Sequence, residues 1–262
     1  MRIAIIGGGN LGVSIAEGLL TSGFCVPADL SITRRNHVAL SGFSSMGVYV
    51  TSDNVNTVRN ADVVILAVKP YQVKEVIESF RSQLRENHIL ISVVTGVMIH
   101  ELLEMVSMQL PVFRAMPNTA IAIRESMTCI AYAHALEPDI RYVHELFGKL
   151  GKVTIINEGL MDAATVLGAC GTAYAMRYIR ANIQGGIEIG FDAATANLIA
   201  AQTVKGAAQM LLEKKTHPEQ EIDKVTTPKG CTIAGLNEME HQGFSSSLIK
   251  GISASYQKIK KD

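Results

Sequence analysis

Three glycines, Gly7, Gly9 and Gly12, form the spacing Gly-x-Gly-x-x-Gly close to the N-terminus. Residues 3–6 before them are rich in β-branched side chains and predict a buried strand, and an amphipathic helical pattern follows over 13–20. In such a strand–turn–helix, Gly7 permits the tight turn, Gly9 lets the backbone approach a pyrophosphate, and Gly12 lets the helix pack closely on the strand. The N–H groups at the helix start then face the anion. The stretch predicts a dinucleotide site.

Two adjacent arginines follow the strand that alternating apolar residues predict at 30–33. In dinucleotide-binding folds an Asp or Glu about twenty residues beyond the glycines accepts from the ribose 2′-hydroxyl, whereas an Arg accommodates a 2′-phosphate. Here the acid is absent, and Arg34 and Arg35 stand at that point. A solvated turn is the alternative, but the pair favours NADPH, with NADH as a further possibility.

A second constellation lies toward the other end of the chain, where residues 225–236 predict a loop that leads into a helix. Many of its side chains are small or carry hydroxyl groups, so several backbone N–H groups at the helix N-terminus stay free to bind a carboxylate. The alternative is that Thr227 or Thr232 is an ordinary helix cap.

The amino-acid composition limits the kinds of partner that we expect the chain to bind. The chain has 262 residues, with 24 Lys and Arg against 24 Asp and Glu. We therefore expect a small-molecule substrate and no nucleic acid or membrane partner, because no net field attracts either. The apolar runs at 63–68 and 89–94 fall short of the roughly 20 residues of a membrane-spanning helix. The N-terminus leads directly into a strand, and we expect no targeting segment.

The cysteines, at positions 25, 129, 170 and 231, show neither a CxxC pair nor the spacing of a metal site. The histidines are scattered, and His100 lacks the second histidine that a zinc-binding helix carries. We therefore expect reduced thiols in a cytoplasmic protein without a protein-bound metal.

Strand and helix patterns alternate as far as residue 156, which predicts a doubly wound sheet. The strand at 61–68 is almost wholly apolar, as in the interior of a parallel sheet, and its carboxyl end at 67–70 points to the edge where such sheets bind ligands. From residue 160 onward only long helical periods are found. We predict a dinucleotide-binding α/β domain over 1–158 and an all-α substrate-binding and dimerisation domain over 159–262.

A domain of a few long apolar helices covers its own faces poorly, so we expect burial against a second copy, with packing on the sheet domain as the alternative. The remaining predicted strands are 48–50, 89–94, 112–114, 127–131 and 153–156, and the predicted helices are 55–60, 73–84, 99–106, 138–150, 161–182, 192–212, one beginning after Pro218, 231–241 and 246–259.

Four segments together resemble the pyrroline-5-carboxylate reductase family. They are the glycine turn, ADVVILAVKP at 61–70, RAMPNT at 114–119, and TTPKGCTIAGL at 226–236 followed by Gly243. The resemblance covers nearly the whole chain. It implies an N-terminal Rossmann domain that holds NAD(P)H and a C-terminal helical domain that forms an interlocked homodimer able to assemble further. It also implies reduction of 1-pyrroline-5-carboxylate to L-proline, the last step of proline biosynthesis.

The same resemblance implies the residues of the site. The loop matching 226–232 would grip the substrate carboxylate, Thr232 would bond the ring nitrogen, and Asn54 would contact ribose. The predicted catalytic residue is Thr232, the predicted substrate-binding residues are Thr227, Gly230, Cys231 and Thr232, and the predicted cofactor-binding residues are Gly7, Gly9, Asn10, Leu11, Thr33, Arg34, Arg35, Asn54, Ala67, Val68, Lys69, Pro70, Thr95, Met116, Pro117 and Asn118.

Three departures from the family pattern bear on affinity. Ala169 and Thr172 replace a glycine and a proline of the family's GSGPAY, its AAG reads VTG with Thr95 in the middle, and Lys229 replaces a glycine of PGG. If Lys229 must adopt a positive φ, strain on the order of 1 kcal/mol is added. Its ammonium would equally attract the substrate carboxylate. We interpret Cys231 as filling space, not as a nucleophile.

The expected chemistry needs no attacking side chain. A cyclic imine is readily protonated, and the iminium carbon accepts hydride from the dihydronicotinamide, so positioning carries most of the catalysis. We expect Thr232 to orient the imine nitrogen and steady its proton, while Thr227 and the amides of 230–232 hold the carboxylate.

Two alternatives remain open. A β-hydroxyacid dehydrogenase also has a Rossmann domain followed by helices, but its catalytic Lys and Asn would fall on Ala175 and Ile179 when its GxxG is aligned with residues 168–171. An inactive or regulatory NADP(H)-binding paralogue is compatible with the three departures.

Overall fold

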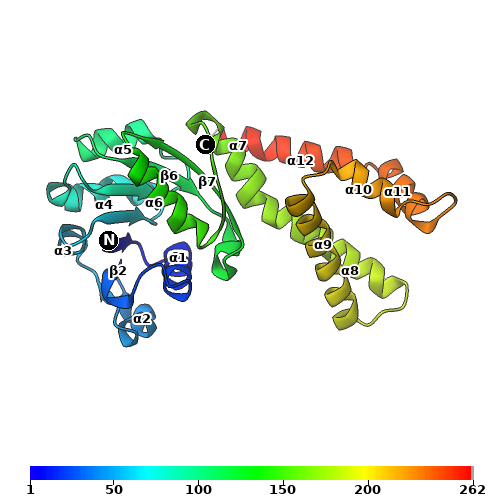
Figure 1. The fold of residues 1–262 in the computed structure, drawn as a ribbon, viewed down its shortest axis with the longest axis horizontal. Coiled ribbons are helices and arrows are strands. Elements are labelled where there is room, and N and C mark those ends of the chain that lie inside the picture. Colours follow the sequence, from blue (N-terminus) through cyan, green and yellow to red (C-terminus); the bar gives the residue numbers. More distant parts are fainter. Residues whose placement is uncertain (261–262) are drawn as a thin grey trace. The chain divides into compact units, whose positions relative to one another are not determined.

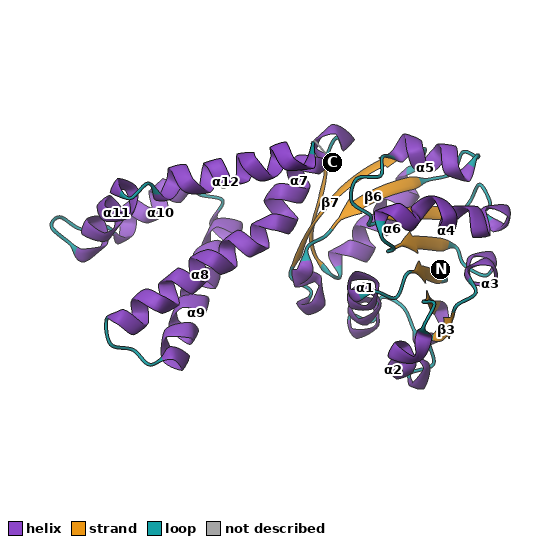
Figure 2. Cartoon of the chain, turned by 180° about the vertical axis from the view of Figure 1, so that it is seen from behind, coloured by secondary structure: helices purple, strands orange, loops and turns teal. Residues whose placement is uncertain are grey.

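The computed structural model describes residues 1–260. The chain divides into two compact units, Met1–Cys170 and a second that begins at Gly171. The strands all lie in the first unit, and the second is built of helices alone (Figures 1 and 2). Within residues 1–260, no helix combines the length and the apolar character that crossing a lipid bilayer requires.

An eight-stranded sheet forms the centre of the first unit, with the order β3-β2-β1-β4-β5-β6-β7-β8. Neighbouring strands are parallel except β6 and β7, which are antiparallel. The strand order reverses between β1 and β4, where such sheets open a crevice beyond their carboxyl ends. The strands are β1 Ile3–Ile6, β2 Leu30–Thr33, β3 Tyr49–Thr51, β4 Val63–Leu66, β5 Ile89–Ser92, β6 Val112–Met116, β7 Ser126–Ala133 and β8 Gly151–Ile155.

Different helices cover the two faces of this sheet. Ile3 and Ile5 of β1 belong to the core beneath α1 and α6, whereas Ala4 and Ile6 belong to the core beneath α3, α4 and α5. Successive side chains of a strand point to opposite faces, so a strand covered on both sides is apolar throughout. The helices of this unit are α1 Asn10–Thr21, α2 Ser41–Ser45, α3 Asn54–Arg59, α4 Val73–Phe80, α5 Ile99–Val106, α6 Glu137–Gly148 and α7 Met161–Ala164.

The predicted fold class is confirmed, and several predicted elements have the observed bounds. The strand at 30–33 and the helix at 99–106 coincide with β2 and α5. Asp192 caps α9 (Ala193–Lys214) as expected, because its carboxylate accepts hydrogen bonds from the N–H groups of Ala194 and Thr195, both at 3.0 Å. Pro218 occupies the first turn of α10 (Pro218–Val225).

The prediction of one regular helix over 161–182 is wrong. After α7 the chain forms a π-helical turn, η7 (Thr165–Cys170), before α8 begins at Gly171. Two side chains bond carbonyl groups in this stretch: the Thr165 hydroxyl donates to Met161 O at 2.9 Å, and the Asn118 amide donates to Gly168 O at 3.2 Å. Side-chain bonds to carbonyls compete with the regular α-helical ladder.

The second unit has little core of its own. Helices α8 and α9 pack as a pair (Figure 1), with Ile183, Ala196 and Ala200 buried between them and Ile179 packed against these three residues. The rings of Tyr178 and Phe244 lie 5.9 Å apart and join α8 to α12. The helices are α8 Gly171–Glu188, α9 Ala193–Lys214, α10 Pro218–Val225, α11 Cys231–His241 and α12 Phe244–Ile259.

Candidate cofactor and substrate sites

The glycine turn after β1 has the geometry that its spacing predicts. Gly7 adopts φ +114°, in the region that favours glycine, and a Cβ there would lie 2.5 Å from the carbonyl oxygen of Ala67. A Cβ on Gly12 would lie 2.1 Å from Gly7 O. The N–H groups of Gly7 and Gly8 donate to Thr33 O at 3.2 and 2.7 Å, so β2 holds the turn in place. Only glycine fits at positions 7 and 12 without movement of the backbone.

Helix α1 begins at the end of this turn with its N-terminal N–H groups open. Gly9 is the N-cap, no side chain caps the helix, and its first turn holds no acidic residue. A Cβ on Gly9 would meet no atom within 4 Å, so the backbone at the N-cap is open on that side. An uncapped helix N-terminus of this kind has the donors that a phosphate group requires.

The two arginines lie beside the glycine turn. The Nη1 of Arg34 donates to Gly8 O at 3.1 Å, and the side chains of both Arg34 and Arg35 are exposed. Guanidinium groups match the oxygens of a phosphate, so this end of the site is suited to a 2′-phosphate.

The glycine turn, the arginines and the ends of β4 and β5 line one groove of about 760 Å³. It lies over the reversal between β1 and β4, and its volume is within the range of small-molecule sites. The residues predicted to bind the cofactor that line it are Gly7, Gly9, Asn10, Leu11, Thr33, Arg34, Arg35, Asn54, Ala67, Val68, Lys69, Pro70 and Thr95.

Three other residues predicted to bind the cofactor do not line this groove. Met116 and Pro117 are buried. Asn118 is engaged within the first unit: its side chain donates to Gly168 O and accepts from Ala120 N at 3.1 Å, and its N–H donates to Ser126 Oγ at 3.1 Å. These contacts account for its side-chain amide without a ligand, and contact of the three residues with a cofactor stays a prediction.

Several residues that line the groove were not predicted from the sequence. The signal that points to Val93 and Val94 is their place after the buried strand β5, at the same edge of the sheet as the glycine turn. The signal that points to Gln72 is the spacing of a capping box, because Gln72 stands three residues after Lys69; its Oε1 accepts from Lys69 N at 3.3 Å and closes the turn after β4. The missed residues are Ile6, Gly8, Asn36, Ser52, Gln72, Val76, Val93 and Val94.

In the second unit, the predicted substrate loop ends at the N-terminus of α11. Gly230 is the N-cap, its N–H donates to Thr227 O at 2.9 Å, and no side chain caps the helix. The alternative that Thr227 or Thr232 caps this helix is therefore wrong, and the N–H groups of its first turn are open, as a carboxylate site requires. Thr232 is half-buried at the second position of α11, and Cys231 is exposed at the first.

Lys229 adopts φ +59° in this loop, which meets the condition under which strain was expected. The left-handed region costs a non-glycine residue about 1 kcal/mol or more. The loop therefore keeps the backbone conformation that a glycine would adopt freely, and it presents an exposed ammonium group one residue before the N-cap of α11.

The cysteines carry no disulfide among the described residues. Burial, and after it the charge of Asp29, raises the pKa of the Cys25 thiol to about 11. Burial also raises the pKa of Cys129. Neither of these thiols lines the groove. Within residues 1–260, no three His, Cys, Asp or Glu side chains gather in a way that would hold a metal ion.

Two family models match the chain. The model described as pyrroline-5-carboxylate reductase dimerisation matches residues 158–262. The model described as NADP oxidoreductase, coenzyme F420-dependent, matches residues 2–96, which hold the glycine turn, the two arginines and the ends of β4 and β5.

Relatives named pyrroline-5-carboxylate reductase match nearly the whole chain. Pyrroline-5-carboxylate reductase 2 of Dictyostelium discoideum is 43% identical over 276 residues, which cover 99% of this chain and 92% of that protein. Pyrroline-5-carboxylate reductase 1 of the same organism is 44% identical over 98% of this chain, and the chain spans about half of its length, 49%.

A solved structure has the same fold. The pyrroline carboxylate reductase of Plasmodium falciparum with NADP bound matches with a TM-score of 0.89 and 25% identity, over 100% of this chain and 97% of that one. An identity well above 30% over nearly the full length of a relative, together with the dimerisation model and the shared fold, confirms the family that the sequence motifs predict. The chain belongs to the pyrroline-5-carboxylate reductase family.

Proposed function

We propose that this chain reduces 1-pyrroline-5-carboxylate to L-proline by NADPH-dependent hydride transfer to the ring imine. The observation that carries the proposal is the groove over the β1/β4 reversal, where an uncapped helix N-terminus and two arginines lie together. Membership of the family supports the substrate. The NADP of the Plasmodium structure and of the N-terminal family model supports the cofactor.

The groove fits a phosphorylated dinucleotide. Gly9 leaves the approach to the α1 N-terminus open, Gly8 O anchors Arg34, and Arg35 adds a second guanidinium. Asn10 and Leu11 present backbone N–H groups of the first helical turn to the pyrophosphate. When bound, NADPH supplies the hydride.

The substrate is held by the loop before α11. The N–H groups of Cys231 and Thr232, which open the first turn of α11, and the Thr227 hydroxyl bind its carboxylate, while the N–H of Gly230, also predicted to contribute, is engaged by Thr227 O and holds the loop closed. The Thr232 hydroxyl orients the imine nitrogen and stabilises the proton on it. Because the iminium carbon is already electrophilic, the protein contributes by positioning the substrate for hydride transfer and by excluding unreactive orientations of it. The exposed ammonium of Lys229 adds attraction for the carboxylate.

The dehydrogenase alternative has no proton donor in the required place. Ala175 and Ile179 stand in α8 where that class carries Lys and Asn, and Ile179 packs in an apolar cluster with Ile183, Ala196 and Ala200. Reduction of a ketone to an alcohol needs a proton donor beside the carbonyl oxygen.

The chain acts as a homodimer through its helical unit. The family model for dimerisation supports this, as do the many large apolar side chains that the second unit leaves exposed. Monomeric domains rarely expose so much apolar surface. Light scattering on the purified protein tests it, and a monomer at micromolar concentration would contradict it. These side chains include Met176, Ile187, Ile189, Phe191, Leu198, Ile199, Leu212, Leu248 and Ile249.

A cytoplasmic location is supported by the cysteines, which are all unpaired, as is usual in a reducing compartment. Cell fractionation with an antibody to the protein tests this, and recovery in an oxidising compartment would contradict it.

Turnover tests the function as a whole. Purified protein is incubated with NADPH and 1-pyrroline-5-carboxylate, and both cofactor oxidation and proline are measured. One proline formed for each NADPH oxidised is the expected result. NADPH binding without turnover would instead support a regulatory paralogue, and oxidation only with the ketone of a hydroxyacid would support a dehydrogenase.

A further inference from the structure

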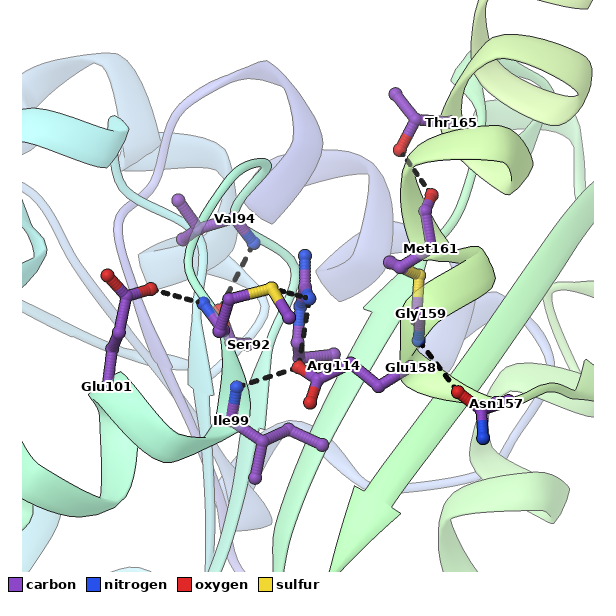
Figure 3. A network of polar contacts seen from close by, with 11 residues as sticks. Ser92, Val94, Ile99, Glu101, Arg114, Asn157, Glu158, Gly159, Met161 and Thr165 are labelled. Atoms are coloured by element: carbon purple, nitrogen blue, oxygen red, sulfur yellow. Dashed lines mark hydrogen bonds and ion pairs between the residues drawn. The ribbon is translucent and has the colours of Figure 1, made fainter. Parts of the chain in front are cut away.

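Arg114 of β6 is a buried arginine whose hydrogen-bonding capacity is largely unused. It is 2% exposed, and its Nη1 donates to Glu158 Oε1 at 2.9 Å (Figure 3). The same Nη1 donates to Met98 Sδ at 3.0 Å. Its Nε and Nη2 find no partner among residues 1–260. Unpaired polar groups away from water cost free energy. A buried side chain that leaves two of its donor atoms unsatisfied is expected to serve a purpose other than stability.

Glu158 connects Arg114 to the start of α5. The same Oε1 that binds the guanidinium accepts from Ile99 N, the first residue of α5, at 2.7 Å (Figure 3). Met98 is held twice, because its sulfur accepts from Arg114 and its N–H donates to Glu101 Oε2 at 2.6 Å. The pair Arg114–Glu158 therefore fixes the end of the loop 93–98, which joins β5 to α5.

This loop is a wall of the cofactor groove. Val93, Val94 and Thr95 line the groove, and the start of the loop is tied to β5, since Val94 N donates to Ser92 Oγ at 3.3 Å. The strand order β2-β1-β4-β5 places the loop at the end of the groove opposite Arg34 and Arg35. If the arginines hold the 2′-phosphate, the loop borders the nicotinamide.

We propose that Arg114 is a positioning residue for hydride transfer: through Glu158 and Met98 it fixes loop 93–98, and with it Thr95, against the nicotinamide end of the groove. The proposal rests on the function proposed above. Because the phosphates are held elsewhere, by the glycine turn and the arginines, loss of Arg114 affects the reacting geometry far more than cofactor affinity. Small displacements of reacting groups cost large factors in rate.

The experiment compares Arg114→Met and Arg114→Lys with Arg85→Met. Arg85 is a matched control, because it too ties backbone segments, donating to Arg59 O at 3.0 Å and Ala61 O at 2.9 Å, but it lies before β5, at the opposite edge of the sheet. Turnover is expressed per NADPH-binding site, so that loss of folded protein does not count. We expect R114M to lower kcat by about tenfold to a hundredfold with the KM for NADPH changed less than about threefold.

Lysine keeps one bond to Glu158, so R114K is expected to recover part of the lost kcat, and R85M to leave kcat per site unchanged. A kcat per site within about twofold of wild type for R114M would overturn the proposal. If R114M does not fold, Glu158→Gln takes its place: it keeps an oxygen for Ile99 N but loses the charge, and unchanged turnover in that variant also overturns the proposal.

Hydrogen exchange separates this proposal from the proposed function. Amides of loop 93–98 should exchange at least about tenfold faster in R114M than in wild type, both with and without NADPH. In R85M they should exchange as in wild type. Absence of proline formation by the wild-type protein would reject the proposed function and leave this measurement valid. If the wild-type protein forms proline but loop 93–98 exchanges equally fast in R114M and in wild type, the positioning role alone is rejected.

Discussion

Arg34 Nη1 donates a hydrogen bond of 3.1 Å to the backbone carbonyl of Gly8, and this bond joins the arginine at the end of β2 to the glycine turn after β1. The group proposed to hold the 2′-phosphate is thereby tied to the backbone proposed to hold the pyrophosphate. Arg35 also lines the groove, and it makes no such bond to the turn among the described residues. The contributions of the two arginines to cofactor binding can therefore be distinguished by mutation.

Arg35→Ala should lower kcat/KM with NADPH by at least about tenfold, which corresponds to about 1.4 kcal/mol, and leave kcat/KM with NADH nearly unchanged. The reason is that only NADPH carries the 2′-phosphate. Arg34→Ala should weaken the binding of both cofactors, because it also removes the bond to Gly8 O that helps to hold the glycine turn. Arg141→Ala, which removes an exposed arginine paired with Glu137 on α6, serves as the control. A wild-type preference for NADH of tenfold or more would contradict the prediction.

Two glycines of the turn should respond in opposite ways. Gly12→Ala places a Cβ 2.1 Å from Gly7 O and should cost about 1–3 kcal/mol of unfolding free energy, measured by denaturant titration. Gly9→Ser meets no protein atom, and its hydroxyl caps α1, so stability should be kept while NADPH affinity falls at least tenfold, because the hydroxyl occupies the place of the phosphate. Full NADPH affinity in Gly9→Ser would show that the pyrophosphate does not bind there.

Thr232→Ala should lower kcat/KM for 1-pyrroline-5-carboxylate by about tenfold to a hundredfold, because the hydroxyl that orients the imine nitrogen is lost. NADPH affinity, measured by titration, should not change, since the cofactor groove lies in the first unit. Thr232→Ser, which keeps the hydroxyl, is the control and should retain most of the activity. Unaltered turnover in Thr232→Ala would remove this residue from the mechanism.

Lys229 and Lys215 form a matched pair, since both adopt the left-handed conformation, with φ +59° and +55°. Replacing either by glycine should relieve strain of about 1 kcal/mol and raise the unfolding free energy. Only Lys229→Gly should also raise the KM for 1-pyrroline-5-carboxylate, by about threefold, because only that ammonium lies in the proposed carboxylate loop. An equal change of KM in both variants would show that Lys229 has no role in substrate affinity.

His88 should make stability depend on pH. Its ring is wholly buried; Nδ1 accepts from Arg85 N at 3.0 Å, so Nε2 carries the proton and donates to Ala61 O at 3.0 Å. Burial, and after it the charge of Arg85, lowers the pKa of His88. A histidine whose pKa is lowered by folding stabilises the protein fully above its unfolded pKa of about 6.5. Below that value the contribution is lost, at up to about 1.4 kcal/mol per pH unit, until the folded pKa is reached.

Denaturant titration between pH 8 and pH 5 measures this loss, with His88→Gln as the comparison. The variant should be less stable at the higher pH and show a shallower fall toward the lower one. The same pH slope in both proteins would assign the pH dependence to other groups.

Local patterns were sufficient for much of this protein. The glycine spacing, the Asp192 cap, the proline that opens α10 and the apolar strands depend on hydrogen bonds and periodicity within a few residues, and these appear in the structure as predicted. The carboxyl-edge rule for parallel sheets brought most of the predicted cofactor residues into one groove.

The sequence by itself thus determined the fold class, the family and the identity of most groove residues, because each of these is written in short-range patterns or in motifs. Only the tertiary structure decided what Asn118 and Arg114 do. Asn118 reaches Gly168 and Arg114 reaches Glu158, partners some fifty and forty-four residues away. Such pairs form only when the register of the sheet and the packing of the core bring distant segments together, and no local pattern encodes that meeting.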